Sequence, residues 1–358
     1  MVNKLKKHHI KELDGLRAIA AIAVLMFHSY IPIIGRYGWI GVPIFFVLSG
    51  FLVTGILLDS LEAENYYSAF YIRRGLRILP IYYLFLLVMY IPHVLWHPEK
   101  GNELFPVYAF YLQNIYGSGS FVKGAFNHTW TLAIETQFYF LWPLIVKTLR
   151  LKGILLVCPL LIVISIVLRA LNVLTNVPIP LNISGMDQLC MGAFLAALIR
   201  TDFFYKNQSQ FRLASLLLPI LMIGSYLSIT KLTSLTPIWV SGRPDFLFGV
   251  LLAPLVGVFV LIIISGWIPL LNIVLCVPPL LYIAKISYGL YLYHFPIFYL
   301  LIPHLSTYGF NIPARYLFII QIIPTTCIAI LSWHFIEDPI NSLKRRFKYR
   351  MPQADAVR

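Results

Sequence analysis

Long apolar runs, each close to twenty residues, recur along the whole chain, and short polar stretches separate them. A helix of about 20 apolar residues is long enough to cross the hydrocarbon core of a bilayer. The pattern therefore predicts an all-α fold, a polytopic membrane helix bundle. We place its about ten transmembrane helices at residues 15–33, 39–58, 78–95, 129–147, 153–171, 185–200, 212–230, 245–265, 286–303 and 315–335.

Two more apolar segments fit this count less well. Residues 102–118, NELFPVYAFYLQNIYGS, are short and interrupted, which is typical of a re-entrant or surface-lying segment. Residues 266–285 could form an eleventh crossing. Pro269, Pro278 and Pro279 interrupt that segment, however, and an eleventh crossing would place the two chain ends on opposite sides of the membrane. We therefore expect residues 266–285 to be half-inserted or interfacial.

The basic residues orient the helices. Most of them lie in the N-terminal stretch NKLKKHHIK, in YIRRGLR, in the linkers KTLRLK and RTDFFYKNQSQFR, and in the tail KRRFKYR. With ten crossings all five stretches fall on one side, and the positive-inside rule makes that side, and both termini, cytoplasmic. Three regions follow: a basic cytoplasmic N-terminus (1–14), a transmembrane domain (15–339) and a basic cytoplasmic tail (340–358).

Composition agrees with this class and adds a strong positive charge. Of the 358 residues, 59% are hydrophobic and 12% charged, whereas a soluble domain carries about a quarter charged residues. The net charge of +14 falls on cytoplasmic loops, where anionic membrane lipids account for part of it and a polyanionic substrate could account for more. No basic folded domain stands outside the membrane, so nucleic acid is not expected as a partner. The four cysteines lack metal-ligand spacing, so no metal is expected.

The first apolar helix carries three ionisable residues. Asp14 and Arg17 are three residues apart, and His28 follows Arg17 by eleven, so all three share one helix face. At 1.5 Å per residue, His28 lies about 16 Å beyond Arg17, at membrane depth, where ionisable groups usually face a cavity or a partner. Helix capping by Asp14, snorkelling of Arg17 and a structural hydrogen bond of His28 remain alternatives.

Glu135 is the expected partner of His28. It lies in NHTWTLAIETQFYFLWP, at a depth that matches the depth of His28 in its own helix. A carboxylate that orients an imidazole produces a general base able to act on a hydroxyl, although a purely structural pair remains open. Trp130 is a candidate wall of an acceptor pocket, where a flat ring suits a sugar. His294 either lines the cavity or forms a hydrogen bond within the bundle.

Three arginines, Arg73, Arg74 and Arg77, open a helix at the cytoplasmic face. Guanidinium groups this close together suit the phosphate groups of a ligand, while ordinary anchoring at the headgroups is the alternative. A phosphate site on the cytoplasmic side of a buried acid–base pair implies a long ligand with a phosphorylated head and a thin reactive arm. Thioesters of coenzyme A (CoA) have that shape.

Six motifs in this order carry a resemblance to a known family: LDGLRAIAAIAVLMFH, GVPIFFVLSGFLV, RRGLRILP, NHTWTLAIETQFYFLWP, MDQLCMGAFLA and AKISYGLYLYHFP. The chain resembles the acyltransferase-3 family of integral membrane acyltransferases, the type that includes bacterial polysaccharide O-acetyltransferases, from about residue 10 to 339. The resemblance implies a ten-helix core that takes an acyl group, commonly acetyl, from cytoplasmic acyl-CoA. It also implies that His28 is the catalytic histidine, Glu135 its partner, Arg17 the first-helix arginine, and Arg74 with Arg77 the R-x-x-R pair.

Three positions depart from the family pattern. Pro43 stands where many members have aspartate, Thr131 replaces a common serine, and the arginine that often precedes Asp187 is missing. These departures bear on the substrate more than on the reaction. Some members carry a hydrolase-like domain at the C-terminus. Because the sequence reaches Arg358 without one, we expect the bundle to complete the transfer itself or to hand the acyl group to a separate protein.

The sequence as a whole predicts a multi-pass enzyme of the cell inner (plasma) membrane. We expect an acyl-CoA-dependent O-acyltransferase that moves acetyl (acyl) from acetyl-CoA, or another acyl-CoA, to a sugar hydroxyl of a cell-surface polysaccharide or its lipid-linked precursor. Direct transfer and a covalent acyl-histidine both remain open. The alternative function is a transporter or exporter of an anionic lipid or glycan, with the arginines and His28 as a relay. No inverted repeat that would favour a transporter is apparent.

Overall fold

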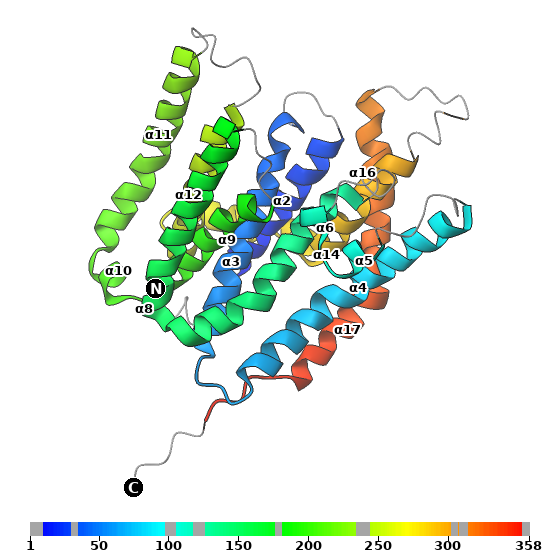
Figure 1. The fold of residues 1–358 in the computed structure, drawn as a ribbon, viewed down its shortest axis with the longest axis horizontal. Helices are drawn as coiled ribbons and strands as arrows, with labels where there is room; N and C mark the ends of the chain where they lie inside the picture. Colours follow the sequence, from blue (N-terminus) through cyan, green and yellow to red (C-terminus); the bar gives the residue numbers. More distant parts are fainter. Residues whose placement is uncertain are drawn as a thin grey trace. The chain divides into compact units, whose positions relative to one another are not determined.

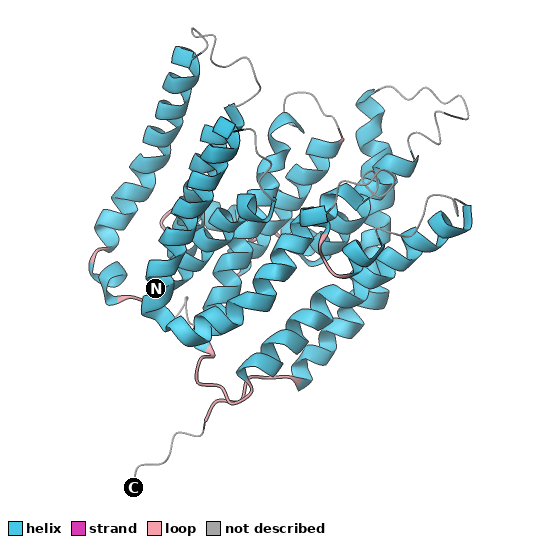
Figure 2. Cartoon of the chain, viewed as in Figure 1, coloured by secondary structure: helices cyan, strands magenta, loops and turns pink. Residues whose placement is uncertain are grey.

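The computed structural model describes residues 10–29, 35–96, 105–116, 126–175, 181–233, 244–301, 307 and 314–352. Within these ranges the regular structure is entirely helical, and Figure 2 shows helices and connecting loops without a strand. The all-α prediction is therefore confirmed for the described part of the chain. The ends of several predicted spans, most of the N-terminal region and the last six residues of the tail lie outside it.

The chain forms two compact units, each assembled from separate stretches. The first unit takes Met1–Arg17, Pro43–Ile56 and Leu149–Leu281, and the second takes Ala18–Val42, Leu57–Thr148 and Tyr282–Arg358. Four helices contribute residues to both units: α2 (Lys11–His28), α3 (Gly41–Asp59), α8 (Trp130–Thr175) and α14 (Pro278–Pro296).

The first unit contains α9 (Leu181–Leu198), α10 (Asp202–Lys206), α11 (Gln208–Thr233), α12 (Pro244–Ser265) and α13 (Pro269–Leu275). Helix α12 packs against both α9 and α11 (Figure 1). Glycines let α3 and α9 meet backbone to backbone, because a Cβ on Gly50 would lie 1.9 Å from the carbonyl oxygen of Leu189, and one on Gly192 would lie 2.0 Å from that of Val47. Small residues serve such close helix contacts in membrane proteins.

The second unit contains α4 (Tyr66–Trp96), α14 (Pro278–Pro296) and α16 (Ala314–Ser332) as its long helices. The shorter elements are η1 (Gly35–Ile40), α5 (Phe105–Ala109), α6 (Gln113–Tyr116), η3 (Asn127–Thr129), η5 (Ile297–Leu301), η6 (Trp333–Glu337), α17 (Asp338–Ser342) and η7 (Leu343–Arg346). Helix α4 packs against α5, α17, η6 and η7, and Figure 1 shows α17 alongside α4.

The number of membrane crossings is only partly established. Within the described residues, four helical stretches qualify as spans by length and apolar composition: Tyr37–Asp59, Tyr66–Ile91, Asn127–Leu171 and Tyr316–Arg346. A fifth is added if α12 and α13, which are bent by 94° at their junction, count as one broken span. Each of the ten predicted spans overlaps a helix, but the count of ten and the cytoplasmic placement of the termini stay predictions.

The two predicted spans 129–147 and 153–171 lie on either side of a break in α8. The break falls in the polar linker between them, at Arg150, whose non-helical backbone has φ 52° and ψ −166°. The two spans are therefore separate helices that meet at this kink. The backbone breaks again inside residues 266–285, where Gly266 adopts φ 67° before the short helix α13. That segment is not one continuous helix, which favours the half-inserted or interfacial prediction over an eleventh crossing.

Candidate active site

His28 is the last residue of α2, and its half-buried imidazole makes two contacts through one nitrogen. Its Nδ1 lies 3.1 Å from the carbonyl oxygen of Val24, one turn earlier, and 3.1 Å from Nε2 of His294. The rings of Phe27 and Phe295 meet the His28 ring edge-on, with centroids 5.0 and 4.9 Å away. His28 is therefore held by its own helix and by a second histidine in an aromatic setting.

The hydrogen bonds of His294 define the tautomer of both rings. His294 lies on α14 and is fully buried, and its Nδ1 is 2.7 Å from the carbonyl oxygen of Tyr291. A carbonyl only accepts, so Nδ1 of a neutral His294 carries the proton and Nε2 carries the lone pair. Nδ1 of His28 then donates to Nε2 of His294 and to Val24. The remaining nitrogen of His28, Nε2, is left with a lone pair that can accept a proton.

A third imidazole, His128 on η3, lies beside this pair. Its ring is buried, 5.1 Å from the ring of His294 between centroids, and stacked on Phe295 at 5.3 Å. Its Nε2 lies 3.0 Å from the carbonyl oxygen of Leu292, whereas its buried Nδ1 has no hydrogen-bond partner among the residues that the structure describes. We did not single out His128 from the sequence. The motif NHTW that contains it was the available signal.

Thr131 and Tyr291 close one side of the histidine cluster. The hydroxyl of Thr131 lies 2.5 Å from that of Tyr291, which also donates to the carbonyl oxygen of His128 at 3.0 Å. Threonine in place of the family's serine therefore keeps the hydroxyl. The missing arginine before Asp187 is matched by Arg169 on α8, whose guanidinium lies 2.8 Å from the buried Asp187 carboxylate within the first unit.

Glu135 contacts a tyrosine of its own helix. Its half-buried carboxylate accepts a hydrogen bond from Tyr139, one turn later on α8. It also lies within electrostatic range of the phenols of Tyr288 and Tyr291 on α14. The orientation of His28 that we expected Glu135 to provide is supplied in the structure by Val24 and His294. A direct pairing of His28 with Glu135 stays a prediction.

The three arginines of α4 have different surroundings. Arg73 donates from Nη1 to the carbonyl oxygens of Lys344, at 3.2 Å, and Phe347, at 3.3 Å. The guanidinium of Arg74 lies over the ring of Tyr139, 4.9 Å from its centroid. Arg77 is close enough to Glu337 for its charge to act on that carboxylate. Tyr139 thus joins Arg74 to Glu135.

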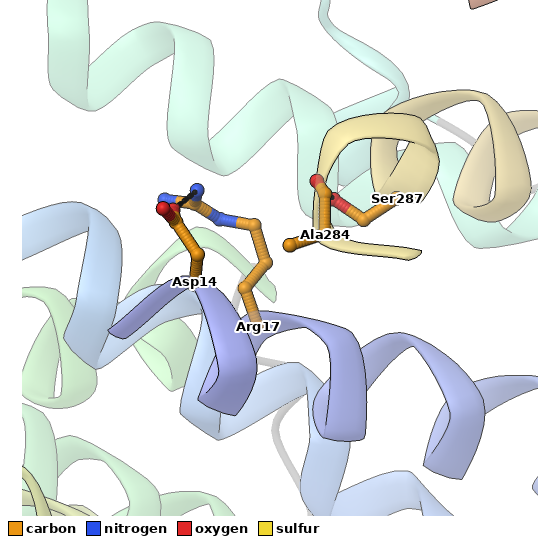
Figure 3. A network of polar contacts seen from close by, with 4 residues as sticks. All are labelled: Asp14, Arg17, Ala284 and Ser287. Atoms are coloured by element: carbon orange, nitrogen blue, oxygen red, sulfur yellow. Dashed lines mark hydrogen bonds and ion pairs between the residues drawn. The ribbon is translucent and has the colours of Figure 1, made fainter. Parts of the chain in front are cut away.

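Asp14 and Arg17 form an ion pair within the first unit. Their carboxylate and guanidinium lie 3.1 Å apart, three residues apart on α2, and Figure 3 shows the pair. Because α2 begins at Lys11, Asp14 lies inside its first turn, and the alternative that it caps the helix is wrong. Figure 3 also shows Ser287 of the second unit, whose hydroxyl donates to the carbonyl oxygen of Ala284 at 2.8 Å.

Two further sequence predictions concern Trp130 and metal binding. Trp130 is the first residue of α8, and its side chain is half-buried. Its role as a wall of the acceptor pocket stays a prediction. Among the residues that the structure describes, no three His, Cys, Asp or Glu side chains are placed to hold a metal ion.

Comparisons with known proteins give the family. The acyltransferase-3 family model, described as an acyltransferase domain, matches residues 10–334. Peptidoglycan O-acetyltransferase OatA of Listeria monocytogenes is 31% identical over 94% of this chain and 56% of its own length. O-acetyltransferase OatA of Staphylococcus aureus is 28% identical over 95% of this chain and 58% of its own length.

The chain thus spans little more than half the length of these relatives. No solved structure matches it. Since the family model covers most of the 358 residues, the family predicted from the six motifs is confirmed, and the chain belongs to the acyltransferase-3 family of membrane acyltransferases.

Proposed function

We propose that this protein is a membrane O-acetyltransferase of the plasma membrane that moves an acetyl group from cytoplasmic acetyl-CoA to a sugar hydroxyl of a cell-surface polysaccharide. Peptidoglycan is the first acceptor to test, because the Listeria relative is named for it. The alternative, an exporter of an anionic lipid or glycan, gains nothing from a family match to acyltransferases.

The observation that carries the proposal is the contact between Nδ1 of His28 and Nε2 of His294. With Nδ1 of His28 engaged as a donor, Nε2 is the basic nitrogen. In the proposed reaction Nε2 accepts the proton of the acceptor hydroxyl while the oxygen attacks the thioester carbonyl. The C–S bond then breaks, and the CoA sulfur leaves with the proton that His28 returns. His294 acts as a positioning residue, since its lone pair stabilises the positive charge that develops on His28.

The donor is assigned to the arginines of α4. Arg74 and Arg77 lie near the basic start of α4, which we propose faces the cytoplasm. Guanidinium groups bind phosphates through paired, charge-assisted hydrogen bonds. Asp14 with Arg17 are proposed as supporting residues near the start of α2, and Trp130 as part of the acceptor pocket. Glu135 is proposed to act with Tyr139 next to the donor.

The test uses the full chain, purified and reconstituted in lipid nanodiscs. It is supplied with radiolabelled acetyl-CoA and a panel of acceptors that includes peptidoglycan fragments. We expect release of the CoA thiol together with base-labile label on the sugar, and loss of both in His28→Ala. A folded parent protein that releases no thiol and labels no glycan would contradict the proposal. Transport of the glycan without acetyl transfer would favour the exporter.

A further inference from the structure

The C-terminal residues 343–350, which we call the C-terminal strap, are bonded to the start of α4. The side-chain amide of Asn65 donates to the carbonyl oxygen of Lys348 at 2.9 Å, and its oxygen accepts from the backbone N–H of Arg350 at 2.8 Å. The backbone N–H of Glu64 donates to the carbonyl oxygen of Arg350 at 3.0 Å. The strap is therefore held in a defined position beside the N-terminal end of α4.

The bonds that hold the strap join two segments of the same charge. Helix α4 contributes three arginines near its start, and the strap contributes two lysines and three arginines: Lys344, Arg345, Arg346, Lys348 and Arg350. These hydrogen bonds run through backbone groups, the Asn65 amide and the Arg73 guanidinium rather than through opposite charges. Like charges brought together repel one another, so the arrangement gains most when an anion lies between them.

Arg73 and Lys344 have different roles in this arrangement. Arg73 donates to two strap carbonyls, those of Lys344 and Phe347, so its role is to position the strap. The ammonium group of Lys344 donates to the side-chain oxygen of Asn341, and the charges of all three arginines act on it. Lys344 is half-buried, whereas its neighbour Arg345 is exposed. Lys344 is thus the strap cation that faces the arginines of α4.

Arg77 acts electrostatically on the carboxylate of Glu337. The three arginines of α4 and the five basic residues of the strap nevertheless place cations on both segments. A ligand with two or more phosphate charges could contact both segments at once. Both a nucleotide and a lipid headgroup offer such chemistry.

We propose that the C-terminal strap completes a phosphate site with α4, in which Lys344 joins Arg74 and Arg77 as a third cationic contact to the phosphates of the CoA nucleotide. This inference rests on the proposed function, since it names a further part of the donor site. Arg73 and Asn65 hold the strap in place, so the site forms only when the strap is bonded to them.

The first experiment measures binding of CoA and of 3′,5′-ADP to the full chain by calorimetry, in nanodiscs made only of phosphatidylcholine. Lys344→Gln keeps a donor for Asn341 but removes the charge, and it should weaken binding roughly tenfold or more, the usual size for loss of a charge-assisted contact. The matched control, Arg345→Gln at the exposed neighbouring residue, should change the dissociation constant less than about twofold. Equal effects of the two variants would overturn the inference.

The second experiment changes an uncharged residue to test whether the strap must be held against α4. Asn65→Ala removes two bonds to the strap and no charge, and it should weaken CoA binding and speed tryptic cleavage after Arg346. Ser68→Ala, which removes a hydroxyl bonded to the backbone of Asn65, is the control. Normal CoA affinity in Asn65→Ala, with the strap cleaved faster, would show that the strap does not contribute to the site.

A third arm separates the two sources of phosphate. Nanodiscs containing phosphatidylglycerol are compared with those of phosphatidylcholine alone. Unchanged CoA affinity in Lys344→Gln, together with lower retention of phosphatidylglycerol, would assign the site to a lipid headgroup and overturn the nucleotide inference. A parent that binds neither CoA nor 3′,5′-ADP would contradict the donor of the proposed function and the nucleotide inference with it. A parent that binds CoA, with Lys344→Gln equal to its control, would contradict the inference alone.

Discussion

Replacing His294 by leucine isolates the contribution of the second histidine to the reactivity of His28. The substitution removes the acceptor that lies 3.1 Å from Nδ1 of His28 and keeps an apolar side chain of similar bulk in a fully buried position. A hydrogen bond to a charged group contributes about 1.5–3 kcal/mol. The charge on His28 develops only in the transition state, so kcat should fall roughly 10- to 150-fold. The KM for acetyl-CoA should stay within about twofold.

The assay is release of the CoA thiol by the reconstituted protein, with folding checked by thermal melting. His294→Gln should restore much of the lost rate, because its side-chain oxygen can accept near the position of Nε2. Ser287→Ala is the matched control, since it removes another buried polar group of α14, one whose hydroxyl bonds within its own helix turn. It should leave kcat nearly unchanged.

Combination with His28→Ala gives the sharpest refutation. If His294 acts through His28, adding His294→Leu to His28→Ala should reduce the residual rate no further. A further fall by the same factor as in the single variant would mean that the two residues act independently. A normal kcat in His294→Leu, or a loss matched by Ser287→Ala, would return His294 to a structural role.

Three further results are expected. Arg74→Ala and Arg77→Ala should each weaken CoA binding roughly tenfold or more in a folded protein, and unchanged affinity in both would leave headgroup anchoring as their role. Tyr139→Phe removes the hydrogen bond to Glu135 but keeps the ring under Arg74, so it should lower kcat several-fold and spare CoA affinity, whereas Tyr139→Leu should affect both; equal effects of the two would refute this division. Cysteine labelling should place Arg74 on the cytoplasmic side and Asn127 on the outer side, and finding both on one side would rule out the predicted topology.

The helices could be predicted from the sequence because an apolar run that enters lipid must satisfy its backbone hydrogen bonds internally, and a helix does so. Their ends could not. Helix α2 begins at Lys11, four residues before the apolar run, since polar residues continue a helix as readily as they end it. The polar linker KTLRLK was expected to separate two spans, and the helical backbone does break there, but at the one residue Arg150 rather than over a loop of several residues. The sequence indicates that a break is needed and does not show at which residue it falls.

The candidate site was predictable in part for a similar reason. His28 stood out because an imidazole in an apolar helix is costly without a partner. Its partner could not be read from matching depths alone, since several helices present polar groups at one depth. The contact between α2 and α14, which the sequence does not show, brings His294 to His28. Tyr139 follows Glu135 by four residues, and the rule that such residues are neighbours on a helix would have found it.

The contacts around Glu135 suggest why a carboxylate lies here at all. Tyr139 donates to it and at the same time lies under the guanidinium of Arg74, so the carboxylate is one hydrogen bond away from the proposed donor site. On its other side Glu135 acts electrostatically on Tyr291, whose ring is 5.6 Å from that of His294 between centroids. Phosphate bound at Arg74 would draw that guanidinium from the tyrosine ring and change the environment of Glu135. Glu135 therefore lies between the proposed donor site and the histidine cluster. A carboxylate that only oriented the base would not need to lie next to the donor site.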